Sequence, residues 1–182
     1  MNMNMDMDWY ALFVKNGREV LIADLLNKRF CPNELSFFIP KRRVPEKREG
    51  RQFDTVKMLL PGYVLINTNM TNEIYYKLKK IPHIFRMLNK HETLNEEVHY
   101  YKIERREMEP IIQMSGGDGC IDYSDIKLSG TNIVVVNGPL KGMESQIKKI
   151  DKHKKRAKLQ LDFLGKRLQF DVGINIINPT QE

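Results

Sequence analysis

Long hydrophobic runs are absent from this sequence of 182 residues. No apolar stretch approaches the roughly 18 residues that a membrane-spanning helix needs. The amino-terminal MNMNMDMD contains no basic segment followed by an apolar one, so we expect no secretory signal and interpret residues 1–8 as a disordered tail. A hydrophobic fraction of 41% still suffices for a packed core. Together these features predict a cytoplasmic globular protein.

Cysteine and histidine are scarce. Cys31 and Cys120 lie far apart in the sequence and, without an export signal, are expected to be reduced cytosolic thiols. No metal-ligand spacing joins the cysteines to the histidines or the histidines to one another. The histidines are His83, His91, His99 and His153. We therefore predict neither a metal site nor a cofactor.

Recognisable signatures of catalysis are missing too. The SGGDG of residues 115–119 follows a helical pattern rather than a strand, and it lacks the Gly-Lys-Ser/Thr ending of a phosphate-binding loop. No nucleophile stands at a recognisable spacing from a base. We therefore predict a binding protein and not an enzyme.

Positive charge is concentrated in the last third of the chain. Residues 1–125 hold 19 Lys and Arg against 18 Asp and Glu, a net charge of +1. Residues 126–182 hold 11 against 5, a net charge of +6. This asymmetry indicates that the carboxy-terminal part meets phosphate or another acidic surface.

Strand and helix patterns alternate over residues 9–114 and predict an α+β domain. Pro40 and Pro45 lack amide donors, so the first strand of the expected hairpin should lie at a sheet edge or in an arm that leaves the sheet. The expected elements are a strand over 9–15, a helix over about 18–30, two strands joined by a hairpin near 46–50, a strand over 62–67, a helix between Thr71 and Pro82, a strand over 83–88 and a helix over 95–114.

The pattern changes after residue 114. The segment SGGDGCIDYSD, residues 115–125, is too rich in glycine for a helix or a strand and is interpreted as a linker. Beyond it, apolar residues alternate with period two, as in AKLQLDF over 157–163. Short antiparallel strands of this kind can bury one face only by curling into a small barrel. The sequence thus predicts an α+β domain, a glycine-rich linker and a small all-β barrel.

Three ordered motifs resemble the NusG family of transcription elongation factors. WYALFVKNGRE (9–19) is similar to the opening strand, turn and helix of that family, and LLPGYVLI (59–66) to its Pro-Gly-Tyr-Val-Leu segment. IVVVNGPLKGMESQIKKID (133–151) is similar to its KOW signature. The KOW turn corresponds to Gly138, Pro139 and Gly142.

The resemblance implies a domain organisation. An amino-terminal NGN-like domain that binds RNA polymerase is expected over 9–114, a linker over 115–125 and an SH3-like KOW barrel over 126–179. The sequence departs from the family pattern at Leu60, where phenylalanine is usual, and at Ser145, where glycine is common. With the extended basic runs, these departures resemble a specialised paralogue such as the LoaP group of processive antiterminators.

The second motif implies the surface that binds RNA polymerase. The resemblance assigns contact with the clamp helices of the polymerase to Leu60, Pro61, Tyr63 and Leu65. Strand alternation places Tyr63 and Leu65 on one side and Val64 and Ile66 on the other. Without the resemblance either pair could form the core; with it, we expect Tyr63 and Leu65 in the interface.

Seven basic residues surround the expected hairpin between strands 146–150 and 157–161, and Asp151 alone opposes them. Flexible cations at a hairpin tip can follow a phosphate backbone, so we predict contact with nascent RNA, such as a structured leader hairpin. The alternative is a solvated basic tip. The seven residues are Lys148, Lys149, Lys152, Lys154, Lys155, Arg156 and Lys158.

A second basic segment spans residues 41–51 and is diluted by Glu46, Glu49 and Asp54. Its two interpretations are cross-strand ion pairs and contact with DNA or emerging RNA. Its basic residues are Lys41, Arg42, Arg43, Lys47, Arg48 and Arg51.

The loop within LDFLGKRLQF is a further candidate. The resemblance implies that it contacts partners, including a small-subunit ribosomal protein. Leu164 and Lys166 are the expected exposed contacts, whereas Phe163 is expected in the barrel core.

The leading hypothesis is a monomeric transcription elongation factor that binds the polymerase clamp and promotes antitermination or readthrough. Its KOW domain would contact nascent RNA or a partner protein, and tethering would raise the effective concentration of either. The alternatives are a ribosome-associated KOW protein that binds RNA, a housekeeping NusG-type factor and an RNA-modifying enzyme.

Overall fold

The computed structural model describes residues 7–88, 100–129 and 132–177. Contacts divide the chain into two compact units. The first consists of Met1–Ile39 and Leu60–Met108, and the second of Pro40–Leu59 and Glu109–Glu182. Each unit therefore contains two separate stretches of the chain.

The first unit is built on a four-stranded antiparallel sheet with the strand order β2-β5-β1-β6. The hydroxyl of Thr71 accepts a hydrogen bond of 3.3 Å from the amide of Ile74, which confirms the predicted start of the second helix. The strands are β1 (Asp8–Val14), β2 (Leu35–Phe38), β5 (Tyr63–Thr68) and β6 (Ile84–Met87), and the helices are α1 (Glu19–Arg29) and α2 (Asn72–Lys79).

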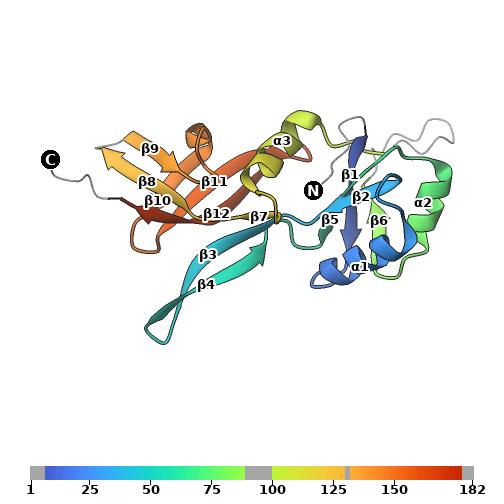
Figure 1. The fold of residues 1–182 in the computed structure, drawn as a ribbon, viewed down its shortest axis with the longest axis horizontal. Helices are drawn as coiled ribbons and strands as arrows, with labels where there is room; N and C mark the ends of the chain where they lie inside the picture. Colours follow the sequence, from blue (N-terminus) through green and yellow to red (C-terminus); the bar gives the residue numbers. More distant parts are fainter. Residues whose placement is uncertain (1–6, 89–99, 130–131, 178–182) are drawn as a thin grey trace. The chain divides into compact units, whose positions relative to one another are not determined.

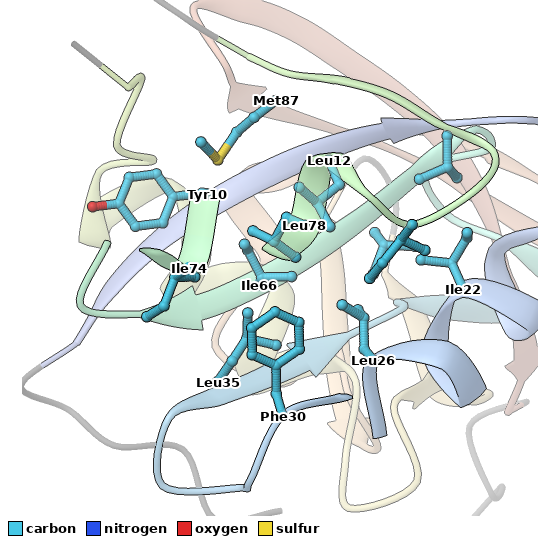
Figure 2. Close-up of a cluster of buried hydrophobic side chains, with 13 residues drawn as sticks. Tyr10, Leu12, Ile22, Leu26, Phe30, Leu35, Ile66, Ile74, Leu78 and Met87 are labelled. Carbon is cyan, nitrogen blue, oxygen red and sulfur yellow. The ribbon is translucent and has the colours of Figure 1, made fainter. Parts of the chain in front are cut away.

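A hydrophobic core lies between this sheet and its two helices. Figure 2 shows Ile22 and Leu26 of α1 and Leu78 of α2 gathered with Ile66 and Leu12 of the sheet. Burial of each such side chain contributes about 1.5–3 kcal/mol. The buried apolar residues of both helices therefore fix the helices on the sheet.

The chain leaves the first sheet at Pro40. The strand expected to contain Pro40 is divided there: β2 ends at Phe38, and β3 (Lys41–Arg48) belongs to the second unit. Proline has no amide to donate, so the ladder of β2 cannot continue through it. β2 is thus the expected edge strand, and β3 forms the expected arm.

The second unit contains two sheets, with the orders β4-β3-β7 and β10-β11-β12-β8-β9. Figure 1 shows β3 and β4 as a long twisted hairpin. Its turn is Glu49-Gly50, and both residues have positive φ, as a two-residue type I′ turn requires. The remaining elements are β4 (Arg51–Met58), α3 (Arg105–Met114, which begins in the first unit), β7 (Cys120–Ile121), β8 (Ser124–Ser129), β9 (Asn132–Asn137), the 3₁₀ turn η1 (Glu144–Gln146), β10 (Ile147–Asp151), β11 (Arg156–Phe163) and β12 (Lys166–Ile176).

The predicted period-two pattern is confirmed in β11. Ala157, Leu159, Leu161 and Phe163 are all buried. One detail of the expectation is wrong, because β12 pairs with β8 in parallel over Ile174–Ile176. β12 is long enough, at 11 residues, to pair first with β11 and then, at its far end, with β8.

The KOW turn anchors this unit. Gly138 has φ +98°, and a Cβ there would lie 2.7 Å from the Cα of Ser124, so only glycine fits. The amide of Leu140 donates a hydrogen bond of 3.0 Å to the hydroxyl of Ser124, and Leu140 is fully buried. Pro139 and Gly142 complete the turn around this buried leucine.

Two expectations near α3 are corrected. The helix predicted over 95–114 begins at Arg105; residues 95–99 lie outside the described residues, and residues 100–104 are not helical. Ile103 instead donates a backbone hydrogen bond of 2.8 Å to Trp9. In the expected linker, only residues 115–119 form a turn; Cys120 and Ile121 are buried and pair with β3 as β7.

Candidate functional site

An exposed cluster of aromatic rings lies beside the Pro-Gly-Tyr segment. The ring of Phe13 on β1 is centred 5.5 Å from that of Tyr63 on β5 and 5.7 Å from that of Phe85 on β6. Phe85 is 62% exposed, and Phe13 and Tyr63 are partly buried. The guanidinium of Arg86 lies 5.6 Å from the centroid of the Phe13 ring. Grouped exposed aromatic rings are typical of protein-binding surfaces, and we name Phe13, Tyr63 and Phe85 the aromatic face.

A buried carboxylate holds the start of β5 in place. Glu19 is 1% exposed, and its Oε1 accepts a hydrogen bond of 2.7 Å from the amide of Gly62. The carbonyl of Gly62 in turn accepts a bond of 2.8 Å from the amide of Val14. The first residue of α1 therefore fixes the turn from which Tyr63 emerges.

The structure corrects two of the residues predicted for this surface. Leu65 is 0% exposed and Leu60 is 7% exposed, whereas Pro61 is exposed and Tyr63 is partly exposed. β5 is a central strand of the sheet, and every residue from Val64 to Thr68 is buried. Alternation alone assumed that one side of the strand faces solvent, which does not hold for a strand covered on both faces.

Phe13 and Phe85 were missed because they lie outside the Pro-Gly-Tyr motif. β1 and β5 pair with Phe13 opposite Tyr63, and β1 and β6 pair with Phe13 opposite Arg86. The available signal was the unexplained aromatic residue in the strand WYALFVK, but its partners depend on the strand register.

The β10–β11 hairpin presents the basic tip that the sequence predicted. The carboxylate of Asp151 accepts a hydrogen bond of 2.9 Å from the amide of Lys154, and this bond chiefly lowers the pKa of Asp151. Lys155 closes the turn at φ +49°. The exposed lysines of the hairpin are Lys148, Lys149, Lys152, Lys154, Lys155 and Lys158.

Two of the seven predicted RNA contacts, Arg156 and Lys158, bind residues on other strands of the unit. Nε and Nη2 of Arg156 both donate to the carbonyl of Pro45, the former at 3.1 Å. Nη1 of Arg156 lies 3.9 Å from the carboxylate of Asp171, and Nζ of Lys158 lies 3.4 Å from it. Arg156 is therefore primarily a link between β11 and the β3–β4 hairpin.

Two arginines of the β3–β4 hairpin also bind other residues of the unit. Arg43 pairs with Asp122 at 3.1 Å, and Arg42 donates to the carbonyl of Asp171. Burial is the main cause that lowers the pKa of Arg42. These contacts hold the hairpin against β12 and against the segment between β7 and β8, so both arginines have a structural role.

The other predicted cations of the β3–β4 hairpin differ in exposure. Lys41 is partly buried at the start of β3, and its amide donates a bond of 2.9 Å to the carbonyl of Gly119. Lys47, Arg48 and Arg51 lie exposed around the Glu49-Gly50 turn, and no ion pair involves them within the described part of the chain.

The two basic segments, separate in sequence, line one groove. The groove has a volume of about 790 Å³ and lies between the turn of the β3–β4 hairpin and the turn of the β10–β11 hairpin. We name it the basic groove. It is lined by Pro45, Glu46, Lys47, Arg48, Gln52, Phe53, His153, Lys154 and Arg156.

The turn between β11 and β12 places the remaining candidates at the surface. Leu164 is partly exposed at φ +53°, a conformation that a leucine adopts at a cost, and Lys166 is exposed. Phe163 is buried, as predicted.

Residues 7–88, 100–129 and 132–177 contain neither a membrane-spanning helix nor a group of metal ligands. No helix there is long and apolar enough to span a membrane. No group of histidine, cysteine and acidic side chains there could hold a metal ion.

Comparison with known proteins identifies the family. The sequence model of the family described as "Transcription termination factor nusG" matches residues 7–112, more than half of the chain. The chain belongs to the NusG family. The NusG resemblance inferred from the three motifs is thereby confirmed, and this is a family of transcription termination and antitermination factors.

NusG proteins of several bacteria match nearly the whole chain. The "Transcription termination/antitermination protein NusG" of Rickettsia felis is 24% identical over 173 residues, covering 92% of this chain and 87% of the relative. The protein of the same name from Streptococcus pyogenes serotype M3 is 25% identical over 166 residues, covering 88% and 89%. A solved structure described as "Domain interaction in Thermotoga maritima NusG" matches with a TM-score of 0.58 at 20% identity, over 93% of this chain and 94% of that one, and confirms the NusG fold.

Proposed function

We propose that this NusG-family protein is a transcription elongation factor that binds RNA polymerase through the aromatic face and promotes antitermination or readthrough. The aromatic face carries the proposal, because it is an exposed apolar cluster next to the family's Pro-Gly-Tyr segment. Partly buried aromatic anchors supply much of the binding energy in protein interfaces. The protein then acts in the cytoplasm or nucleoid, where transcription takes place.

The proposed mechanism is preferential binding. A protein that binds one conformation of the polymerase more tightly than another shifts the equilibrium between them by that difference in affinity. A tenfold preference for the elongating state over a paused state corresponds to about 1.4 kcal/mol. No covalent chemistry is needed.

The second unit supplies the additional contacts in this proposal. Its basic hairpin contacts nascent RNA, and Leu164 and Lys166 offer a small exposed site for a partner such as a small-subunit ribosomal protein. A contact that is weak by itself becomes effective when the first unit is already bound to the polymerase, because tethering raises its local concentration.

Capture of core RNA polymerase tests the aromatic face. We expect the wild type to capture the polymerase and the Tyr63→Asp, Phe85→Asp double variant to lose at least tenfold in capture, because both substitutions put charge into the proposed interface. Tyr76→Asp is the matched control, since Tyr76 is an exposed aromatic residue on α2, away from the aromatic face. Equal capture by wild type and double variant would remove the aromatic face from the proposal.

A purified transcription assay tests the outcome. Wild type should raise readthrough of a terminator placed after a leader RNA, and the double variant should not. If the wild type leaves readthrough unchanged but sediments with ribosomes, a ribosome-associated RNA-binding role replaces the present proposal.

A further inference from the structure

The basic groove joins two hairpins that are more than a hundred residues apart in sequence. Arg156 on β11 reaches the carbonyl of Pro45 on β3, and the hydroxyl of Tyr123 donates a bond of 2.6 Å to Asp54 on β4. The groove is therefore formed within the second unit before any ligand arrives, and a preformed site avoids part of the ordering cost of binding.

Positive charge in this groove is largely uncompensated. The one acidic lining residue, Glu46, forms an ion pair with Lys57 and lies 3.9 Å from Arg156. Lys154 lies 4.0 Å from Asp151 in an exposed, weak pair. Lys47 and Arg48 have no ion-pair partner in the described chain. The groove thus presents several cations to a ligand, which must be anionic.

Phe53 adds an aromatic surface that the fold leaves unused. It lies on β4, is 40% exposed and lines the groove beside these cations. Cations that follow a phosphate backbone and a ring on which a base stacks are the two features of sites for single-stranded nucleic acids. An acidic protein surface would bind the cations but would leave the ring of Phe53 without a partner. The bases of a double helix are already paired and stacked, so they could not stack on this ring.

We propose that the basic groove binds an unpaired segment of RNA, with phosphates on Lys47, Arg48 and Lys154 and one base stacked on Phe53. This inference rests on the RNA contact in the proposed function, and it replaces two separate basic sites by one composite site. Arg156 holds the two hairpins together and is a positioning residue for the groove.

Fluorescence anisotropy with a labelled single-stranded oligouridine of about 6 nucleotides tests the proposal, because a probe this short fills one site of ordinary size. Phe53→Ala should weaken binding about tenfold, the loss of one stacked base, without changing the salt dependence. Val56→Ala, at a residue 48% exposed on the same strand, is the matched control and should bind like the wild type.

The cations are tested from both hairpins. Arg48→Gln and Lys154→Gln should each weaken binding of the same short probe and each lower the slope of log affinity against log salt by about 0.7, the value for one contact to a single strand. Lys79→Gln, an exposed lysine at the end of α2, should change neither quantity. Circular dichroism of every variant should match the wild type.

Three results would overturn the composite site. The first is that the wild type does not bind the oligouridine, and the second is that Phe53→Ala binds it with unchanged affinity. The third is that only the substitution on one of the two hairpins weakens binding. Competition by polyglutamate at equal charge, equally sensitive to Phe53→Ala, would assign the groove to an acidic protein instead. Polymerase capture by the wild type is measured in parallel; if the wild type captures the polymerase but does not bind the oligouridine, the RNA groove is wrong and the polymerase contact stands.

Discussion

The aromatic face and the basic groove are held together in different ways. The aromatic face lies on three neighbouring strands of one sheet, where backbone ladders set the positions of Phe13, Tyr63 and Phe85. The basic groove lies between two hairpins, and long side chains such as Arg156 set their separation. Ladders within a sheet break cooperatively, whereas side-chain links can be lost one at a time. The groove should therefore be the easier of the two surfaces to dismantle with a single substitution.

The largest effect should come from damage to the sheet beneath the aromatic face. Leu65→Ala should lower the free energy of unfolding by about 2–5 kcal/mol, because it leaves a cavity at a fully buried position. Tyr63→Ala, two residues away and partly exposed, should cost about 1 kcal/mol or less. Urea unfolding followed by the fluorescence of Trp9, the one tryptophan of the chain, reports on this unit. Similar costs for the two variants would mean that Leu65 is not packed as described.

Arg156→Met should open the groove while leaving the aromatic face unchanged. The substitution removes charge-assisted hydrogen bonds to the carbonyl of Pro45, each worth about 1.5–3 kcal/mol, and keeps most of the apolar stem. Hydrogen exchange should accelerate in β3 and β4 and stay unchanged in β1 and β5. Lys155→Met, at an exposed residue of the adjacent turn, is the control and should not alter exchange in β3. Unchanged protection in Arg156→Met would show that other contacts hold the hairpin.

Glu19→Gln should loosen the aromatic face locally. The buried carboxylate of Glu19 accepts a hydrogen bond from the backbone N–H of Gly62. The neutral side chain of glutamine accepts more weakly, so we expect the free energy of unfolding to fall by about 1 kcal/mol. Exchange of the Gly62 amide should increase, and polymerase capture should fall, because Tyr63 follows directly on the released turn. Asp24→Asn, at an exposed acidic residue on the same helix, is the control. If the variant is less stable but still captures the polymerase fully, the turn at Gly62 does not position Tyr63 for polymerase binding.

Tyr123→Phe should have the smallest effect and a distinct dependence on pH. Burial, and then the hydrogen bond to Asp54, raise the pKa of Tyr123 above that of an unfolded tyrosine, near 10. Its contribution is therefore fully present below pH about 10 and is lost as the pH rises through the folded pKa. The free energy of unfolding of the variant should be lower than that of the wild type by about 0.5–1.5 kcal/mol at neutral pH. Urea unfolding followed by circular dichroism should show the gap between wild type and variant closing only above pH 10; a gap independent of pH would contradict the assignment.

The two surfaces also differ in how far the sequence could locate them. Local pattern was enough for α1 and α2, for the buried alternation of β11 and for the motif that contains Tyr63, because each depends on neighbours a few residues away. The sequence did not reveal that Leu65 is buried, since cover on both faces of β5 depends on how the rest of the chain packs against the sheet. Arg156 counted as one more surface cation, because its acceptor on Pro45 lies 111 residues away. The groove could not be predicted for the same reason.

The break at Pro40 also determines how this protein can be divided. The chain passes from one unit to the other three times, after Ile39, Leu59 and Met108. A cut in the turn at 115–119 therefore leaves the β3–β4 hairpin on the amino-terminal fragment, while its partners Asp171 and Arg156 depart on the other. That fragment displays an arginine and a proline carbonyl that the intact protein keeps engaged. A chimaera that exchanges carboxy-terminal domains between NusG relatives should consequently carry residues 40–59 along with the barrel. Otherwise the β3–β4 hairpin of one protein will face the barrel of another, without its own partners Asp171 and Arg156.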